Sequence, residues 1–130
     1  MKIADCRIDD EHRQVKADEK LSSVRNMYCH ILVVVEGRKP VGIVTNNDLV
    51  RSIKSEADYE RLKFRDIMTS PVVTVSLEDD LEKAADLMFK KGFMSLPVVD
   101  NKGDFVGLVT YFDYLGKIAD RIKEKAKKSK

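Results

Sequence analysis

The sequence predicts an α+β fold built from two β-α-β-β-α repeats related by pseudo-two-fold symmetry, with the sheets packed between helices. The first observation is a duplicated segment: residues 41–49 read VGIVTNNDL, and residues 106–115 read VGLVTYFDYL. The second copy begins 65 residues after the first in a chain of 130 residues, a recurrence typical of two copies of one supersecondary unit. The second observation is that each copy follows an apolar run and a polar turn, which indicates a β-hairpin.

The second repeat shows its elements most clearly. Apolar residues at i, i+3, i+4 and i+7 from Leu81 predict an amphipathic helix. Ser76 and Asp79 before it resemble a capping box, and Gly92 is expected to end the helix in a left-handed conformation. Strands are predicted at 96–99 and 105–110 around the turn DNKGD, and a further helix from about Tyr111.

The first repeat aligns with the second over the same elements. It predicts a helix from about Leu21, strands at 31–35 and 41–45 around the turn EGRK, and a helix from about 46 to 53. Extended segments are expected near 13–17 and 72–75, and matching lead-ins, KIAD at 2–5 and KFRD at 63–66, precede the two repeats.

The predicted organisation is one compact module. Its parts are a first repeat at 1–55, a linker at 56–62, a second repeat at 63–119 and a basic C-terminal tail at 120–130. The strands at 33–35 and 96–99 are apolar without alternation and need cover on both faces. We therefore expect the repeats to pack against each other through their sheets.

The composition excludes several classes. The 24 Lys and Arg against 22 Asp and Glu leave a net charge of +2, too small to indicate nucleic-acid binding by itself. No apolar run is long enough to span a bilayer, and the polar N-terminus is no secretory signal. We expect a cytoplasmic protein in which Cys6 and Cys29 are reduced thiols.

No catalytic or metal-binding motif stands out. The two histidines lack metal-ligand spacing such as HExxH, and the motifs GxSxG, GxxxxGK[ST] and GxGxxG do not occur. We expect neither an enzyme nor a metal site.

The candidate chemistry lies in the repeated T-x-x-D, at Thr45 and Asp48 and at Thr110 and Asp113. Each copy follows an apolar strand and opens a helix, where free N–H groups favour phosphate. The two oxygens of a carboxylate complement the two hydroxyls of a ribose. The same motif is also a variant of the capping box, so the residues alone leave both interpretations open.

At this point the residues resemble a known family. The segments FRDIMTSPVVTV at 64–75, LPVVD at 96–100 and FVGLVTYFD at 105–113, with their duplicate at 31–48, resemble a tandem pair of CBS (cystathionine β-synthase) domains, or Bateman module. The resemblance implies a stand-alone regulatory sensor that binds AMP, ADP or ATP in clefts between the repeats. S-adenosylmethionine and methylthioadenosine are alternative ligands, and no other cofactor is implied. It also implies a homodimer and a regulated protein that the sequence does not name.

The resemblance also implies which residues bind. The aspartate would hold the ribose, the threonine would lie near the phosphate, and each site would draw on both repeats. One site would combine Thr45, Asp48, Val72, Val73 and Ser95; the other would combine Thr110, Asp113, His12, Arg13 and His30. The second set contains the cations, so we expect a phosphorylated ligand to prefer the Asp113 site, and the Asp48 site to have neutral neighbours.

A different class of function has its own support. The segment 117–130 holds seven Lys and Arg, and it continues an apolar stripe through Leu115, Ile118, Ala119 and Ile122. The alternative is therefore a ligand-free scaffold that contacts a protein or nucleic acid through a basic C-terminal helix. We expect nucleic acid and membranes not to be partners, and assign dimerisation to the helical face around Leu49, Val50, Ile53, Leu115 and Ile118.

Overall fold

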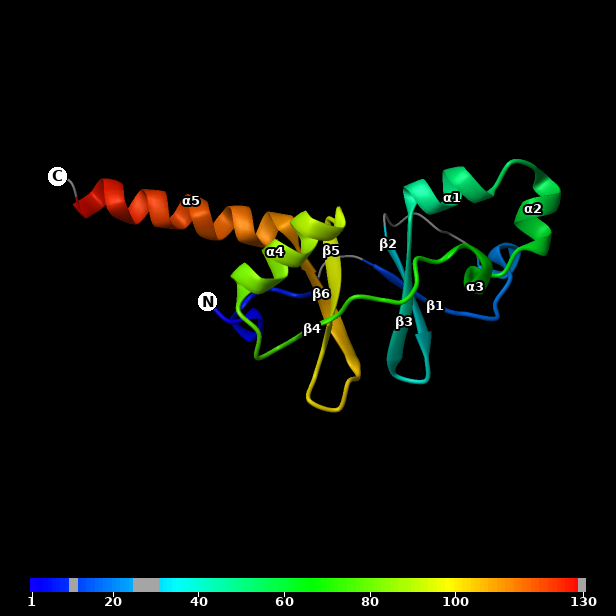
Figure 1. Cartoon of the computed structure of the whole chain (residues 1–130), viewed down its shortest axis with the longest axis horizontal. Helices are drawn as coiled ribbons and strands as arrows, with labels where there is room; N and C mark the ends of the chain where they lie inside the picture. The colour runs from blue at the N-terminus through cyan, green and yellow to red at the C-terminus, as the bar shows by residue number, and fades with distance from the viewer. Residues whose placement is uncertain (10–11, 25–30, 129–130) are drawn as a thin grey trace. The chain divides into compact units, whose positions relative to one another are not determined.

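The computed structural model describes residues 1–9, 12–24 and 31–128 and has the mixed α+β architecture that the sequence predicts (Figure 1). The chain forms two compact units. We call the unit of residues 11–73 and 103–105 the first-repeat unit, and the unit of residues 1–10, 74–102 and 106–130 the second-repeat unit.

The first-repeat unit contains one three-stranded sheet in the order β1-β2-β3. Strand β1 (Arg13–Lys16) runs parallel to β2 (Ile31–Glu36), which forms an antiparallel hairpin with β3 (Lys39–Thr45). Helices α1 (Asn46–Ser52), α2 (Glu56–Arg61) and α3 (Phe64–Ile67) follow. Of the helix expected from about Leu21, the described part is a 3-10 turn, η2 (Leu21–Ser23), and the remainder of that prediction falls outside the described residues.

The core of this unit includes the lead-in of the second repeat. Phe64 and Ile67 of α3 are buried with the sheet residues Val15, Leu32 and Val44. The backbone of the same lead-in then pairs with β3, because Thr69 N donates to Ile43 O at 2.8 Å. Residues 63–69 therefore complete the first-repeat unit, although in sequence they open the second repeat.

The second-repeat unit has the matching sheet, β4-β5-β6. Its strands are β4 (Val75–Ser76), β5 (Ser95–Val99) and β6 (Phe105–Thr110), and its helices are α4 (Leu81–Lys91) and α5 (Tyr111–Lys128). The four apolar residues that predict the first of these helices are all buried. Gly92 ends α4 with φ +72°, the left-handed conformation that glycine adopts without a steric penalty.

The lead-in of the first repeat belongs to this second unit. A 3-10 turn, η1 (Ile3–Asp5), buries Ile3, whose N–H donates to Asp79 O at 2.9 Å. Leu108 N donates to Ile8 O at 2.9 Å, the counterpart of the Thr69 contact in the first-repeat unit. The two lead-ins are thus exchanged, so the compact units differ from the sequence repeats, whose boundaries stay a prediction.

The exchange explains the glycines of the duplicated segment. A Cβ built on Gly42 would lie 2.5 Å from Met68 Sδ, and one built on Gly107 would overlap the carbonyl oxygen of Ile8. Both glycines therefore let a lead-in cross its strand at close range, a recognised use of glycine within strands.

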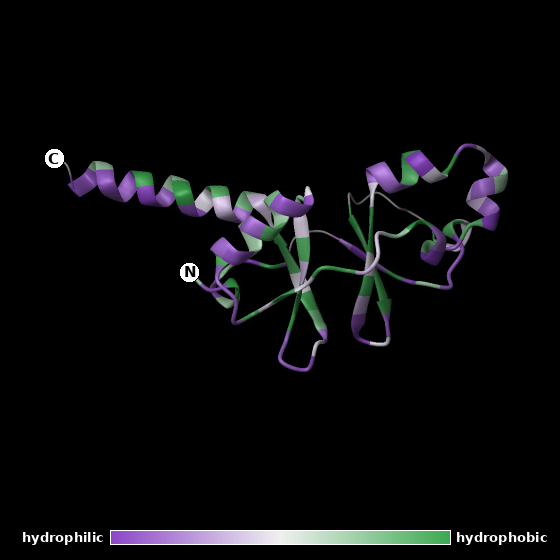
Figure 2. Ribbon diagram, in the orientation of Figure 1, coloured by the Kyte–Doolittle hydropathy of each residue, from purple (hydrophilic) through white to green (hydrophobic). Residues whose placement is uncertain are grey.

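Helix α5 continues through the segment expected as a basic tail. It reaches Lys128, and every residue from Ala119 to Lys128 is exposed. Figure 2 shows apolar and polar residues interleaved along this helix. In the described part of the chain, no helix combines the length and apolar character that crossing a membrane requires.

Ion pairs join the start of α5 to α4. Lys117 Nζ donates to Glu82 Oε1, and Arg121 Nη2 donates to the same oxygen at 3.2 Å. The hydrogen bond from Lys117 lowers the pKa of Glu82 from 4.5 to about 2.

The ion pairs of Glu82 predict that the stability of the fold depends on pH. A carboxylate whose folded pKa is lowered stabilises the fold above its unfolded pKa, and the contribution is lost as the pH falls through the folded value. We expect Glu82→Gln to lower the melting temperature at pH 7, with the difference from wild type shrinking between pH 4.5 and about 2. Thermal unfolding monitored by circular dichroism from pH 2 to 7 measures it. Glu78→Gln, which removes an exposed pair with Lys2, is the control and should change little at any pH. A Glu82→Gln difference that does not vary with pH would contradict the assignment.

Candidate functional site

Asp48 closes a capping box at the junction of β3 and α1. Its Oδ2 accepts hydrogen bonds from Thr45 N at 2.9 Å and from the Thr45 hydroxyl at 3.2 Å. Asp48 N in turn donates to Thr45 Oγ1 at 3.5 Å. The capping interpretation of this motif is therefore realised at Asp48.

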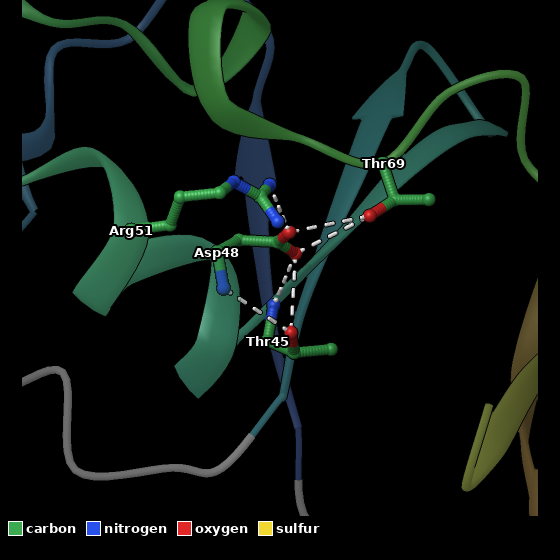
Figure 3. A network of polar contacts seen from close by, with 4 residues as sticks. All are labelled: Thr45, Asp48, Arg51 and Thr69. Atoms are coloured by element: carbon green, nitrogen blue, oxygen red, sulfur yellow. Dashed lines mark hydrogen bonds and ion pairs between the residues drawn. The ribbon is translucent and has the colours of Figure 1, made fainter. Parts of the chain in front are cut away.

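The same carboxylate has two further side-chain partners (Figure 3). Arg51 Nη2 donates to Asp48 Oδ1 at 2.8 Å, and the Thr69 hydroxyl lies 3.4 Å from both carboxylate oxygens. The Asp48 side chain is only 4% exposed, whereas that of Arg51 is 69% exposed. A buried carboxylate needs such donors, because burying an unpaired charge is costly. The expectation of neutral neighbours around Asp48 is therefore wrong.

Asp113 repeats the cap without the cation. Thr110 N donates to Asp113 Oδ2 at 2.8 Å, and the Thr110 hydroxyl donates to the same oxygen at 3.3 Å. Gly116 stands at the position that matches Arg51. Among the residues that the structure describes, none makes a hydrogen bond or ion pair with Asp113 Oδ1. The two copies therefore differ in the second carboxylate oxygen, which is bonded in Asp48 and open in Asp113.

The capping pattern alone does not mark a ligand site, because α2 carries it as well. Asp58 Oδ2 accepts from Lys54 N at 3.1 Å, Asp58 N donates to Ser55 Oγ at 3.3 Å, and Arg61 Nη2 donates to Asp58 Oδ1 at 3.2 Å. These hydrogen bonds lower the pKa of Asp58, and the bond from Lys54 N has the largest effect. Asp58 differs from Asp48 in its surroundings, since its side chain is 25% exposed and, among the described residues, no hydrogen bond joins its carboxylate to a second segment as Thr69 joins that of Asp48. The Asp48 half-site is thus distinguished from the cap of α2 by the burial of its carboxylate and by its contact with the crossing lead-in.

The remaining predicted residues divide between the units. Val72 and Val73 are half-buried in the first-repeat unit, as are His12 and Arg13; the rings of His12 and Phe105 meet edge to face at 5.2 Å. Ser95 is buried in the second-repeat unit. His30 and Cys29 lie outside the described residues.

Two groupings from the sequence therefore stay predictions, because they combine residues of different units. One joins Ser95 to Asp48, and the other joins His12 and Arg13 to Asp113. The residues that sequence reasoning missed are Arg51 and Thr69. The i+3 spacing of Arg51 from Asp48 was a usable signal, since such positions are neighbours on a helix. The approach of Thr69 had no local signal.

Metal binding finds no support in the described ranges 1–9, 12–24 and 31–128, where no group of three or more His, Cys, Asp or Glu side chains could hold an ion. In both half-sites a carboxylate that can accept hydrogen bonds lies next to a threonine hydroxyl.

Comparisons with known proteins agree on one family. A model of the CBS domain matches residues 15–55 and 64–120. An uncharacterized protein of Methanopyrus kandleri is 38% identical over 86 residues, covering 65% of this chain and 44% of that protein. Homoserine O-acetyltransferase of Methanococcus vannielii is 34% identical over 100 residues, covering 77% of this chain and 20% of the enzyme. The chain thus spans less than half the length of these relatives.

Solved structures share the fold. The Arabidopsis thaliana CBS-pair protein CBSX2 superposes with a TM-score of 0.74 at 23% identity, covering 95% of this chain and 96% of that one. A putative acetoin utilization protein, AcuB, from Vibrio cholerae has the same score and identity, covering 100% and 98%. The cytosolic domain of the Mg²⁺ channel MgtE, solved in complex with ATP, has a TM-score of 0.67 at 27% identity, covering 81% of this chain and 44% of that one.

Proposed function

Because the chain belongs to the CBS domain family, we propose that it is a regulatory module that binds AMP, ADP or ATP through Asp48 and Asp113. The observation that carries the proposal is the duplicated Thr–Asp pair, in whose second copy Asp113 Oδ1 makes no hydrogen bond or ion pair with any residue that the structure describes. The ATP complex of the MgtE domain supports an adenosine nucleotide as the ligand class.

The open oxygen of Asp113 suits a ribose hydroxyl. A hydroxyl that donates to an ionised carboxylate makes a charge-assisted bond worth about 1.5–3 kcal/mol. Asp113 Oδ2 is already bonded to Thr110, which holds the carboxylate in one orientation before the ligand arrives. We therefore propose that the Asp113 half-site binds the ribose more tightly than the Asp48 half-site.

The module would act by shifting populations rather than by chemistry. A ligand that binds one arrangement of the chain better than another favours that arrangement, and a partner reads the difference. Exposed apolar side chains on three helices support a homodimer: Val50 on α1, Phe89 on α4 and Leu115 on α5.

A thermal-shift panel tests the proposed function. Wild-type protein would be melted with AMP, ADP, ATP, S-adenosylmethionine and methylthioadenosine from micromolar to millimolar concentration. A ligand that binds only the folded state stabilises it by about 2.7 kcal/mol at 100 times its Kd, so at least one compound should raise the melting temperature in a dose-dependent way. No shift with any of the five at millimolar concentration would contradict the proposal.

The second candidate, a nucleic-acid scaffold, is favoured only by the exposed basic end of α5. It predicts binding to any duplex DNA that weakens steeply as salt rises, because phosphate contacts release counterions. A fluorescence-anisotropy titration with one labelled duplex at 50 and 200 mM salt separates the two candidates.

A further inference from the structure

We infer that Arg51 makes the Asp48 half-site selective for phosphorylated adenosine ligands over the unphosphorylated nucleoside. The inference rests on the proposed function, because it assumes that Asp48 accepts the ribose. It goes further by assigning the selectivity of that half-site to one side chain and by giving the two half-sites different ligand preferences.

The carboxylate of Asp48 has no unused oxygen. Oδ2 accepts from the backbone and the hydroxyl of Thr45, and Oδ1 accepts from Arg51 at 2.8 Å. The Thr69 hydroxyl adds longer contacts of 3.4 Å to both. Each carboxylate oxygen can accept about two hydrogen bonds, so a ribose hydroxyl that approaches Oδ1 competes with the donors already there, and the strongest of these is Arg51.

Arg51 can leave, but it needs another anion. Its side chain is 69% exposed, so the guanidinium has room to turn away from the carboxylate. A nucleoside offers the displaced guanidinium no charge to pair with. A phosphate offers oxygens that match the guanidinium fork, a strong charge-assisted contact. A nucleotide thus replaces the ion pair that it breaks, whereas a nucleoside does not.

The Asp113 half-site has no counterpart of Arg51. Gly116 has no side chain to compete for Asp113, and Asp113 Oδ1 has no partner in the described part of the chain. The Asp113 half-site should therefore discriminate less between nucleotide and nucleoside.

The test measures AMP and adenosine binding by calorimetry in an Asp113→Ala background, which confines the signal to Asp48. The Arg51→Met change keeps an unbranched side chain and removes the charge. We expect it to weaken AMP binding about tenfold while adenosine binding is unchanged or stronger. Arg61→Met is the matched control, because Arg61 makes the same i+3 pair with Asp58 in α2 and should leave both affinities unchanged. Melting curves verify that each variant is folded.

Three results would overturn the inference. AMP and adenosine affinities that fall by the same factor would show that Arg51 only supports the fold. Unchanged affinities would show that Arg51 does not meet the ligand. Loss of all AMP binding in the Asp113→Ala background would show that Asp48 holds no ligand. Failure of the proposed function itself is distinct, because the wild-type chain would then bind neither compound.

Discussion

Phe64→Ala is expected to lower the free energy of unfolding by about 3–5 kcal/mol, the usual cost of truncating a buried phenylalanine. Phe64 is 0% exposed and lies in the core of the first-repeat unit with Val15, Leu32 and Val44. Its α3 belongs to a lead-in whose backbone is bonded to the same unit, since Arg65 N donates to Ala17 O at 2.9 Å. The cavity would therefore open at the point where the exchanged lead-in is anchored.

Urea unfolding followed by circular dichroism measures the loss. Domains of this kind are stable by only about 5–15 kcal/mol, so the change takes a large share of the total. Phe112→Ala is the control, because Phe112 is 71% exposed at the start of α5 and its truncation should cost well under 1 kcal/mol. Equal effects of the two changes would contradict the placement of the lead-in.

In an Asp48→Ala background, which confines the signal to the Asp113 half-site, Asp113→Ala is expected to weaken AMP binding about tenfold or more and to abolish any preference for AMP over 2′-deoxy-AMP. The reason is the loss of the open carboxylate oxygen that would accept from the ribose, at about 1.5–3 kcal/mol for a charge-assisted bond. The change also removes the acceptor of Thr110 N, so some loss of stability will accompany it.

A matched control separates the two effects. Asp79 accepts from Ser76 N at 2.8 Å in the turn before α4, which is the same backbone-to-carboxylate bond across three residues in the same unit. Asp79→Ala should therefore lower the melting temperature without changing the affinity for AMP. If Asp79→Ala weakened AMP binding as much as Asp113→Ala, the effect would be one of stability and not of ribose recognition.

Local patterns predicted much of the fold. The i, i+3, i+4, i+7 spacing from Leu81 and the left-handed Gly92 correctly delimited α4, whereas the capping box expected at Ser76 and Asp79 is wrong, because the N-cap is Asp80 and the Ser76–Asp79 bond lies in the preceding turn. The apolar runs around EGRK and DNKGD correctly predicted both hairpins. These features depend on contacts between residues close in sequence, so the sequence shows them directly.

Long-range contacts were the part that local patterns could not supply. The lead-ins at 2–5 and 63–66 are alike, and each presents one large apolar residue, Ile3 or Phe64, so nothing in their sequence tells which sheet each completes. The same limit hid the environment of Asp48. The burial of Asp48 and its contact with Thr69 arise from the crossing lead-in. A buried carboxylate depends more on its ion pair than an exposed one, so the pair with Arg51 matters more to Asp48 than the similar pair with Arg61 matters to Asp58.

The most direct test of the central claim, that these aspartates hold the ribose of an adenosine ligand, is the ratio of AMP to 2′-deoxy-AMP affinity at the Asp113 half-site alone. Calorimetry measures it on Asp48→Ala and on the double variant Asp48→Ala/Asp113→Ala. We predict that Asp48→Ala binds AMP about tenfold more tightly than 2′-deoxy-AMP, since one charge-assisted hydrogen bond is at stake, and that the ratio falls toward one in the double variant. Equal affinities of Asp48→Ala for the two nucleotides, or a preference that survives in the double variant, would contradict ribose recognition by Asp113.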